Sequence, residues 1–295
     1  MADLLSEQST NARVEANDLR GGINITVDFN GICVSPVWRL GGFHIQFVAL
    51  AVGQAIDVDL HNGPVYLKVV VGEVNRGPRK AFPTAGQVAS TKLEEPRVLA
   101  ERDALLCVIT DTAEAVDEIT DMAQLPFSGP LAERVTWQSF EEKFSSFTDV
   151  FNGLHAHMLP GIHVLDAAGA EITNLLLWTT GKGADASTHN HGQTPSPGSP
   201  AFAEIHLVLR NGTGTGGMYL CEAPDSTERE TMPVQVGEEH GPFFYVDESS
   251  GAPLLKENGA VHYPWHGWQG GEDGIEGEAY DLVAAFEISP AYARI

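Results

Sequence analysis

Short runs of β-branched and aromatic residues recur along most of this chain, and residues that favour turns separate them. Strands are rich in Val, Ile, Phe and Tyr, and domains built from short strands place turn residues about every eight to twelve positions. Runs of this kind in the first half are INITVDF, FHIQFVALAVG, PVYLKVVVGEV and ALLCVITDT, and FAEIHLVL and YDLVAAFEI are two from the second half. The spacing predicts an all-β protein made of sandwich or barrel modules.

One segment interrupts this pattern. Residues 113–154 repeat apolar positions at steps of three and four, which is the period of a helix, and the sequence GPLAER within them resembles a helix start. A duplicated small barrel explains the order of β-rich, helical and β-rich segments more simply than one large sheet does. We therefore predict a polar leader (1–20), an N-terminal barrel (21–112), a helical connector (113–154) and a C-terminal barrel (155–295).

The charge balance excludes several classes of partner. The chain has 40 acidic and 17 basic residues, for a formal net charge of −23. Such a surface repels nucleic acid and anionic membranes and favours neutral or cationic small molecules. The chain begins without the basic and apolar regions of a signal peptide, and its three cysteines are far apart, as is usual for reduced thiols. We expect a cytoplasmic protein with a small-molecule substrate and no nucleic-acid or membrane partner.

Several histidines and one glutamate have the spacing of metal ligands. His189 and His191 are two positions apart, so in a strand both imidazoles face the same side. Glu204 and His206 have the same relation in the next apolar run, and His266 lies on a later one. Imidazole and carboxylate groups together bind divalent metals of the first transition series. The pattern predicts a tetrahedral or octahedral metal site with one position open for water or substrate.

The first of these pairs resembles the opening motif of the cupin superfamily, G-x5-H-x-H-x(3,4)-E-x6-G. Gly183, His189 and His191 keep the spacing of that motif. The chain departs from it further on, because twelve residues separate His191 from Glu204 and seven separate Glu204 from Gly212. We interpret the first difference as a loop inserted between two strands, which barrels tolerate. The resemblance implies that both predicted modules are jelly-roll barrels of the cupin type.

The second cupin motif, roughly P-x-G-x-x-H-x3-N, has two candidates. QVGEEHGPFF supplies His240, and YPWHGWQ supplies His266 and is followed by a run suited to a closing strand. We favour His266 as the last metal ligand, with His240 as a proton carrier beside the metal and Glu239 as an alternative base. Two choices stay open at this point: His206 could replace or supplement Glu204, and His240 could replace His266.

Longer stretches resemble one particular family. WTTGKGADASTHNHG, FAEIHLVLRNGTGTGGMY, EEHGPFF and YPWHGWQ are similar to the cupin region of fungal aldos-2-ulose dehydratase/isomerase, over at least residues 155–290. The resemblance implies a metal-dependent dehydratase or isomerase, a lyase of carbohydrate metabolism, with zinc as the ion. Iron, manganese or nickel would also suit these ligands. We expect aromatic and polar side chains to line a sugar pocket: Trp178, Lys182, Gln193 and Trp265.

The chemistry expected from this site is proton transfer next to a carbonyl. A divalent metal on His189, His191, Glu204 and His266 would polarise a keto-sugar and stabilise an enediolate. His240, Glu239 or His206 would carry the proton. An iron-dependent dioxygenase and a non-catalytic ligand-binding bicupin are the two alternatives. Cupins with two barrels often associate through strand edges, so the resemblance also implies a homodimer.

Two further expectations concern residues outside the ligand set. In the first module the position of the two histidines is taken by Asp57-Val58-Asp59, and His61 stands nearly alone. We therefore expect no metal in the first barrel. Tyr263 is separated from His266 by an odd number of positions, so a continuous strand would turn it away from the metal.

Overall fold

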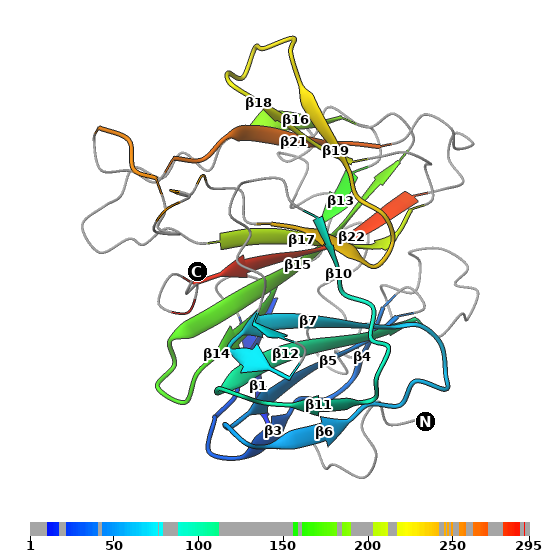
Figure 1. The fold of residues 1–295 in the computed structure, drawn as a ribbon, viewed down its shortest axis with the longest axis vertical. Coiled ribbons are helices and arrows are strands. Elements are labelled where there is room, and N and C mark those ends of the chain that lie inside the picture. Colours follow the sequence, from blue (N-terminus) through cyan, green and yellow to red (C-terminus); the bar gives the residue numbers. More distant parts are fainter. Residues whose placement is uncertain are drawn as a thin grey trace. The chain divides into compact units, whose positions relative to one another are not determined.

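The computed structural model describes most of both halves of the chain. Every regular element among the described residues is a β-strand (Figure 1), so the prediction of an all-β protein is confirmed for this part. None of these residues belongs to a helix long and apolar enough to cross a membrane. The predicted helical connector, residues 113–154, lies outside them. The described residues are 11–17, 22–40, 43–75, 77–78, 88–111, 156–158, 161–181, 185–189, 203–211, 217–241, 245, 247, 249, 254–257, 262–270, 280–289 and 292.

These residues form two compact units, and each unit takes segments from both halves of the chain. The described part of the first unit lies within 11–78, 91–111 and 162–173. The second unit contains 88–90 and the described residues of 156–161 and 174–292. A short segment of the N-terminal half therefore belongs to the second unit, and a hairpin segment of the C-terminal half belongs to the first.

A sheet in the order β3-β5-β12-β7 is the centre of the first unit, with β4 also paired to β5. The longest ladder joins β12 to β5, antiparallel from Ala104 opposite Leu50 to Asp111 opposite Phe43. Two short ladders, β6 with β11 and β8 with β9, accompany this sheet. The strands are β3 (Ile32–Val34), β4 (Trp38–Leu40), β5 (Phe43–Leu50), β6 (Ala55–Asp57), β7 (Val65–Val71), β8 (Glu73–Val74), β9 (Gly77–Pro78), β11 (Arg97–Leu99) and β12 (Ala104–Asp111).

A second group of strands in this unit begins inside the predicted leader. β1 (Arg13–Asn17) pairs antiparallel with β2 (Gly22–Thr26), and β2 pairs in parallel with β14 (Ile162–Leu165). The alternation of polar and apolar residues in RVEAN suits a strand at the edge of a sheet, where one face meets water. Residues 13–17 are thus part of a ladder, although sequence analysis places them in a leader.

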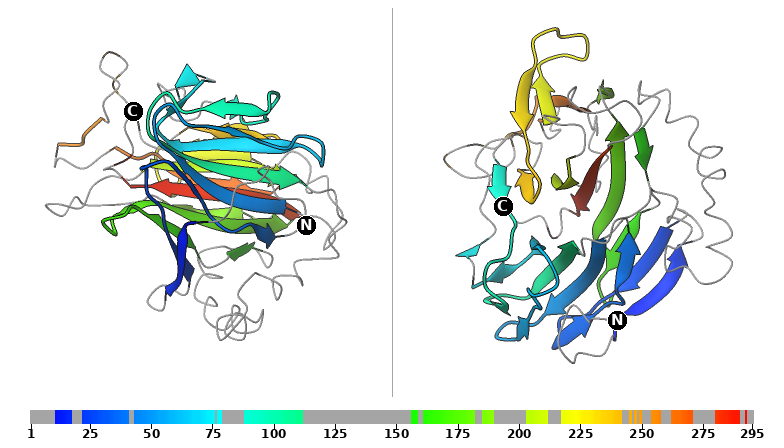
Figure 2. Two further views of the ribbon diagram at one scale, coloured as in Figure 1. Left: turned by 90° about the horizontal axis from the view of Figure 1, so that it is seen from below. Right: turned by 90° about the vertical axis from the view of Figure 1, so that its right-hand side faces the viewer.

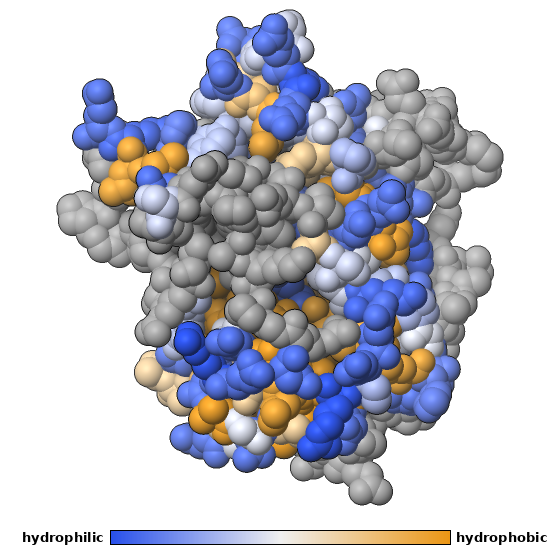
Figure 3. All heavy atoms as spheres, in the orientation of Figure 1, coloured by the Kyte–Doolittle hydropathy of each residue, from blue (hydrophilic) through white to orange (hydrophobic). Residues whose placement is uncertain are grey.

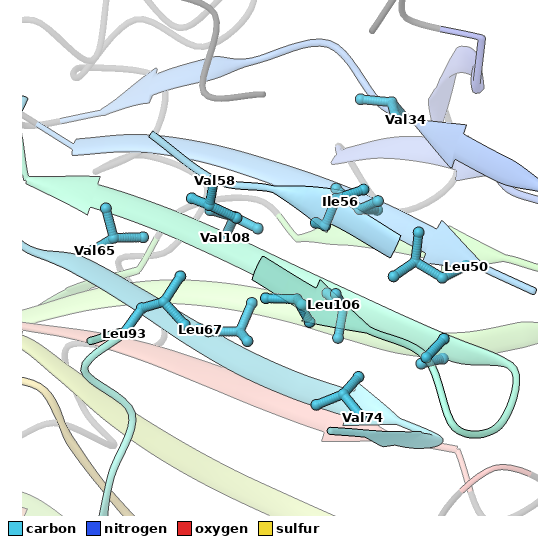
Figure 4. Packing of buried hydrophobic residues seen from close by; sticks show 14 residues of the cluster. Val34, Leu50, Ile56, Val58, Val65, Leu67, Val74, Leu93, Leu106 and Val108 are labelled. Carbon is cyan, nitrogen blue, oxygen red and sulfur yellow. The ribbon is translucent and has the colours of Figure 1, made fainter. Parts of the chain in front are cut away.

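The interior of the first unit is filled by aliphatic side chains. Fourteen buried residues form one cluster, shown in Figure 4, and Val58, Val65, Leu67, Leu106 and Val108 are among them. Along β12 successive side chains point to opposite faces, yet all from Ala104 to Ile109 are 0% exposed, so both faces of this strand are covered. A continuous apolar run is what such a strand requires.

In the segment Asp57-Val58-Asp59, the valine and the two carboxylates have different surroundings. Val58 joins the aliphatic cluster, whereas Asp57 is exposed and forms an ion pair with Arg97 at 3.6 Å. Asp59 accepts a hydrogen bond from the backbone N–H of His61 in the following turn. The two carboxylates therefore have surface roles, and the side chain between them packs in the core.

Two sheets build the second unit. One has the order β15-β22-β17-β20-β10, with β13 also paired to β15, and the other has the order β16-β21-β18-β19. Figure 2 shows these strands from two further directions. The strands are β10 (Val88–Ser90), β13 (Ala156–Met158), β15 (Glu171–Gly181, which begins in the first unit), β16 (Asp185–His189), β17 (Ala203–Arg210), β18 (Gly217–Cys221), β19 (Glu230–Pro233), β20 (Glu238–His240), β21 (Trp265–Gln269) and β22 (Tyr280–Ile288).

Side chains join the two sheets of the second unit. Trp268 on β21 donates its indole N–H to Oδ2 of Asp281 on β22 at 3.3 Å, and Asp281 is 1% exposed. His266, two positions before Trp268, faces the same interior. The space between the sheets is therefore where polar side chains of this unit are buried.

The surface of the described part is mostly hydrophilic. On the face shown in Figure 3, apolar residues lie in small areas between hydrophilic ones. This distribution agrees with the excess of acidic residues in the sequence. The large apolar side chains that are exposed are Val14, Val52, Val236, Leu254 and Leu255.

Candidate metal centre and active site

The second unit brings one carboxylate and two imidazoles into contact. Glu204 and His206 lie two positions apart on β17, and His266 reaches them from β21 in the facing sheet. Oε1 of Glu204 is 3.1 Å from Nε2 of His206, and Oε2 of Glu204 is 3.7 Å from Nε2 of His266. All three side chains are buried. Buried charged groups of this kind are retained where they are paired or bind a ligand.

The tautomer of His266 follows from its second ring nitrogen. Nδ1 of His266 is 3.1 Å from the carbonyl oxygen of Pro264. A carbonyl oxygen only accepts hydrogen bonds, so Nδ1 carries the proton and Nε2 presents a lone pair toward Glu204 when the ring is neutral. An Nδ1–H bound to a backbone carbonyl is the usual arrangement of a histidine that ligates a metal through Nε2.

His240 adds a third imidazole to the cluster. Its ring lies edge-on to that of His206, with the centroids 4.8 Å apart, and its Nδ1 donates to the carbonyl of Gly241 at 2.8 Å. Burial lowers the pKa of His240 well below its usual value, and the neighbouring His206 lowers it further. At neutral pH the ring is therefore uncharged, with Nε2 as its basic atom. A neutral imidazole in this position can accept a proton or a metal.

Two of the four predicted metal ligands are thus brought together, and a third is located by its backbone. His189, the last residue of β16, lies opposite His266 in the ladder of β16 and β21. The side chain of His189 and the whole of His191 lie outside the described residues. The prediction for these two stays a prediction.

The donor chemistry of the cluster suits a divalent metal. Within the described residues no group of three or more His, Cys, Asp and Glu is arranged to hold a metal ion. Glu204 instead contacts the imidazoles of His206 and His266 directly. A buried carboxylate beside imidazole nitrogens is nevertheless a ligand set that zinc, iron, manganese and nickel accept. Glu204 and His266 are the described residues that fit such an ion, and His189 and His191 are the predicted remainder.

Glu239 lies on the other side of its strand from His240. It is opposite Leu207 in the pairing of β20 with β17, and opposite residues of an antiparallel pair point to the same face. Leu207 alternates with His206, so the face of Glu239 is the one turned away from Glu204 and His206. This geometry favours His240 over Glu239 as the proton carrier.

The predicted substrate-pocket residues are only partly described. Trp265 is half-buried on β21, next to His266 and on the opposite face of that strand. Trp178 lies on β15, where only its backbone is described, and Lys182 and Gln193 lie outside the described residues. A sugar pocket formed by these residues stays a prediction.

The expectation for Tyr263 rested on a strand that does not include it. It precedes the first residue of β21, so the alternation of a continuous strand does not apply to it. Tyr263 is 3% exposed, and burial raises the pKa of its phenol, with further increases from the negative charges of Glu204 and Glu287. The charges of both glutamates of the candidate site therefore act on its phenol.

Two more polar residues near the site were missed by sequence reasoning. Glu287 on β22 lies opposite Glu204, and Asn174 on β15 donates from Nδ2 to Oε2 of Glu287 at 3.2 Å. Asn174 directly precedes the apolar run LLLW of β15, and Glu287 lies between Phe286 and Ile288 at the end of the apolar run of β22. A polar residue beside or within such an apolar run was the signal in the sequence that could have revealed them.

The strand that carries His189 is tied to its neighbours by a tyrosine. The Tyr219 hydroxyl on β18 is 3.0 Å from the hydroxyl of Thr188, the residue before His189. The guanidinium of Arg229 lies over the ring of Tyr219, 4.1 Å from its centroid. Tyr219 is 0% exposed, so this contact fixes the end of β16 in a buried setting.

Comparison with known proteins places this chain among cupins. Residues 25–289 match the family described as the aldos-2-ulose dehydratase/isomerase (AUDH) cupin domain. A protein of Phanerodontia chrysosporium named aldos-2-ulose dehydratase is 35% identical over 149 residues, which are 47% of this chain and 16% of that protein. The chain thus spans a small part of this relative.

Two solved structures are among those that match this chain. A cupin 2 conserved barrel domain protein from Leptotrichia buccalis has 11% identity and a TM-score of 0.27, with 90% of this chain and 92% of that chain covered. An oxalate decarboxylase of Lactobacillus farciminis has 10% identity and a TM-score of 0.29, with 99% and 88% covered. Values this low add nothing to an argument about function.

Proposed function

The chain belongs to the family of aldos-2-ulose dehydratase/isomerase cupin domains, and from this premise we propose that it is a metal-dependent lyase or isomerase of keto-sugars. The substrate is a keto-sugar or a similar small molecule with a hydroxyl group next to a carbonyl. The observation that carries the proposal is the buried contact of Glu204 with His206 and His266, with the neutral His240 beside it.

His189, His191, Glu204 and His266 would hold a divalent metal, zinc by resemblance to the family. A metal at this position supplies a Lewis acid that acidifies the carbon next to a carbonyl and favours an enediolate. The roles of the chain are to bind the ion, to exclude water around it and to move one proton. Burial of Glu204 and His266 between two sheets supports the first two roles.

His240 is the residue that we assign to proton transfer. Its Nδ1 is occupied by the Gly241 carbonyl, so Nε2 takes the proton from the carbon next to the substrate carbonyl. Once protonated, Nε2 either gives the proton to a departing β-hydroxyl, which leaves as water, or returns it to the adjacent carbon. The first route is dehydration and the second is isomerisation. Because burial disfavours the charged ring, release of the proton is favoured.

His206 and Glu204 support this exchange. Glu204 favours the protonated form of His240 through its negative charge, whereas His206 opposes it. The edge-on contact of the two rings also fixes the orientation of His240. We therefore assign His206 a positioning role beside the proton carrier.

The experiment measures metal content and turnover in the same preparations. Inductively coupled plasma mass spectrometry on wild type, His189→Ala and His266→Ala is combined with assays on keto-sugars that follow dehydration and isomerisation. About one zinc per chain, absent from both variants together with turnover, is the expected result. His61→Ala is the matched control, because His61 lies in an exposed turn of the first unit.

Other outcomes would redirect the proposal. Iron together with oxygen uptake would indicate a dioxygenase, and a metal-free protein whose His189→Ala variant changes only stability would indicate a non-catalytic binding protein. We also propose that the chain acts as a cytoplasmic homodimer without nucleic-acid or membrane partners. Analytical ultracentrifugation of the purified protein tests the oligomeric state.

A further inference from the structure

Asn174 carries a buried acceptor oxygen that no group among the described residues satisfies. The residue is 8% exposed, and its Nδ2 donates to Oε2 of Glu287 at 3.2 Å. A carboxylate accepts hydrogen bonds, so this contact fixes the orientation of the amide and turns Oδ1 away from Glu287. Within the part of the chain that the structure describes, Oδ1 has no hydrogen-bond partner. A buried acceptor of this kind costs free energy unless a bound molecule supplies the donor.

Asn174 lies in the same sheet as Glu204, two strands away from it. Glu287 is directly opposite Glu204 in the ladder of β22 and β17, and such residues point to the same face of the sheet. Asn174 reaches Glu287 from β15, the neighbour of β22 on its other side. Three adjacent strands therefore place oxygen acceptors in a row, with Glu204 at one end and Asn174 at the other.

The hydrogen-bonding groups of Asn174 and Glu287 indicate which class of ligand would bind there. Oδ1 of Asn174 and the carboxylate of Glu287 accept hydrogen bonds, so the complementary groups are donors such as hydroxyls. Phosphate and carboxylate groups of a ligand would be repelled by Glu287 and by Glu204. A cation is less suited, because one carboxylate oxygen of Glu287 already accepts a hydrogen bond from the Asn174 amide. Neutral polyols satisfy these conditions best.

We propose that Asn174 and Glu287 form a subsite that binds the hydroxyl groups of a polyhydroxylated substrate beyond its reacting carbonyl. The inference rests on the proposed function, since Glu204 and His266 mark the position of that carbonyl. The subsite makes the enzyme selective for ketoses with a chain of hydroxyls over small hydroxy-ketones. A site that hydrogen-bonds a substrate hydroxyl discriminates strongly against analogues that lack it.

The test compares two probes that differ only beyond the reacting group. Hydroxyacetone has a carbonyl and one adjacent hydroxyl, and D-fructose adds further hydroxyls to the same arrangement. Isothermal titration calorimetry gives the Kd of each probe for wild type, Asn174→Leu and Glu287→Gln. Glu287→Gln retains an acceptor for the Asn174 amide, so it keeps the fold if the leucine variant does not. Thr173→Val is the matched control, because Thr173 is buried on the other face of β15.

Wild type is expected to bind D-fructose more tightly than hydroxyacetone. In both site variants the Kd for D-fructose should rise about tenfold, while that for hydroxyacetone changes less than about twofold. Equal weakening of both probes, no effect on either, or a wild type without preference for D-fructose would overturn the subsite. The last result would mean that a water molecule satisfies Asn174.

Different measurements would refute the proposed subsite and the proposed function. The proposed function fails if no keto-sugar is turned over and no metal is bound, whatever the affinities of the two probes. The subsite fails if the preference for D-fructose is the same in Asn174→Leu, Glu287→Gln and wild type, even if keto-sugars are converted.

Discussion

Because His240 is buried and neutral, we expect the free energy of unfolding to decrease as the pH is lowered from 7.0 to 5.5. His240 is 0% exposed, and burial lowers the pKa of its imidazole well below the value in an unfolded chain, about 6.5. As the pH falls below 6.5, the unfolded chain binds a proton that the folded chain does not bind. The free energy of unfolding therefore decreases by about 1.4 kcal/mol per pH unit until the folded-state pKa is reached. Between pH 7.0 and 5.5 the loss is about 1.2 kcal/mol.

Urea unfolding of metal-free protein at pH 7.0, 6.5, 6.0 and 5.5 measures this loss. Carboxylates also change stability at low pH, so the quantity of interest is the difference between wild type and His240→Gln. That difference should shrink by about 1.2 kcal/mol over this range, because glutamine does not titrate. His61→Gln, at an exposed position, should follow wild type. If wild type and His240→Gln lost stability in parallel, His240 would not be held neutral, and its assignment as the base would be refuted.

Two further predictions concern backbone geometry and the contact between the sheets of the second unit. In Gly72→Ala, at a φ of +86°, the new Cβ would lie 2.1 Å from the carbonyl oxygen of Asp103, and we expect a loss of about 2–4 kcal/mol in urea unfolding. Gly53→Ala has a similar φ of +79° but open space around the Cβ, so it should cost about 1–2 kcal/mol. Trp268→Phe removes the hydrogen bond to the buried Asp281 and should cost about 1–3 kcal/mol, with little loss if Asp281 is satisfied by other groups.

The class of the fold was predictable because local sequence determines it. Alternating or continuous apolar runs between turn residues indicate strands whatever their partners, and β12 is buried on both faces as a continuous apolar run requires. The contact of Glu204 with His206 and His266 was also accessible, since i and i+2 spacing and the resemblance to cupins both indicated it.

Strand partners were not predictable in the same way. Period-two patterns say which residues share a face of one strand, and they do not say which strand lies alongside. The pairing of Glu204 with Glu287, and hence the place of Asn174, depends on the register of β17 with β22. The alternation expected for Tyr263 does not apply, because the strand begins two residues after it. The direction of Glu239 likewise follows from its pairing with Leu207.

The place of β10 bears on the order in which the protein folds. This strand comes from the N-terminal half, yet it pairs with β20, with Val88 opposite His240. During synthesis β10 leaves the ribosome long before β20, so the edge beside His240 stays incomplete until most of the chain exists. Contacts between distant segments slow folding, because a long loop must close before they form. In the same way β14, which comes from the C-terminal half, pairs with β2 in the first unit. Neither unit can therefore finish folding from one half of the chain alone.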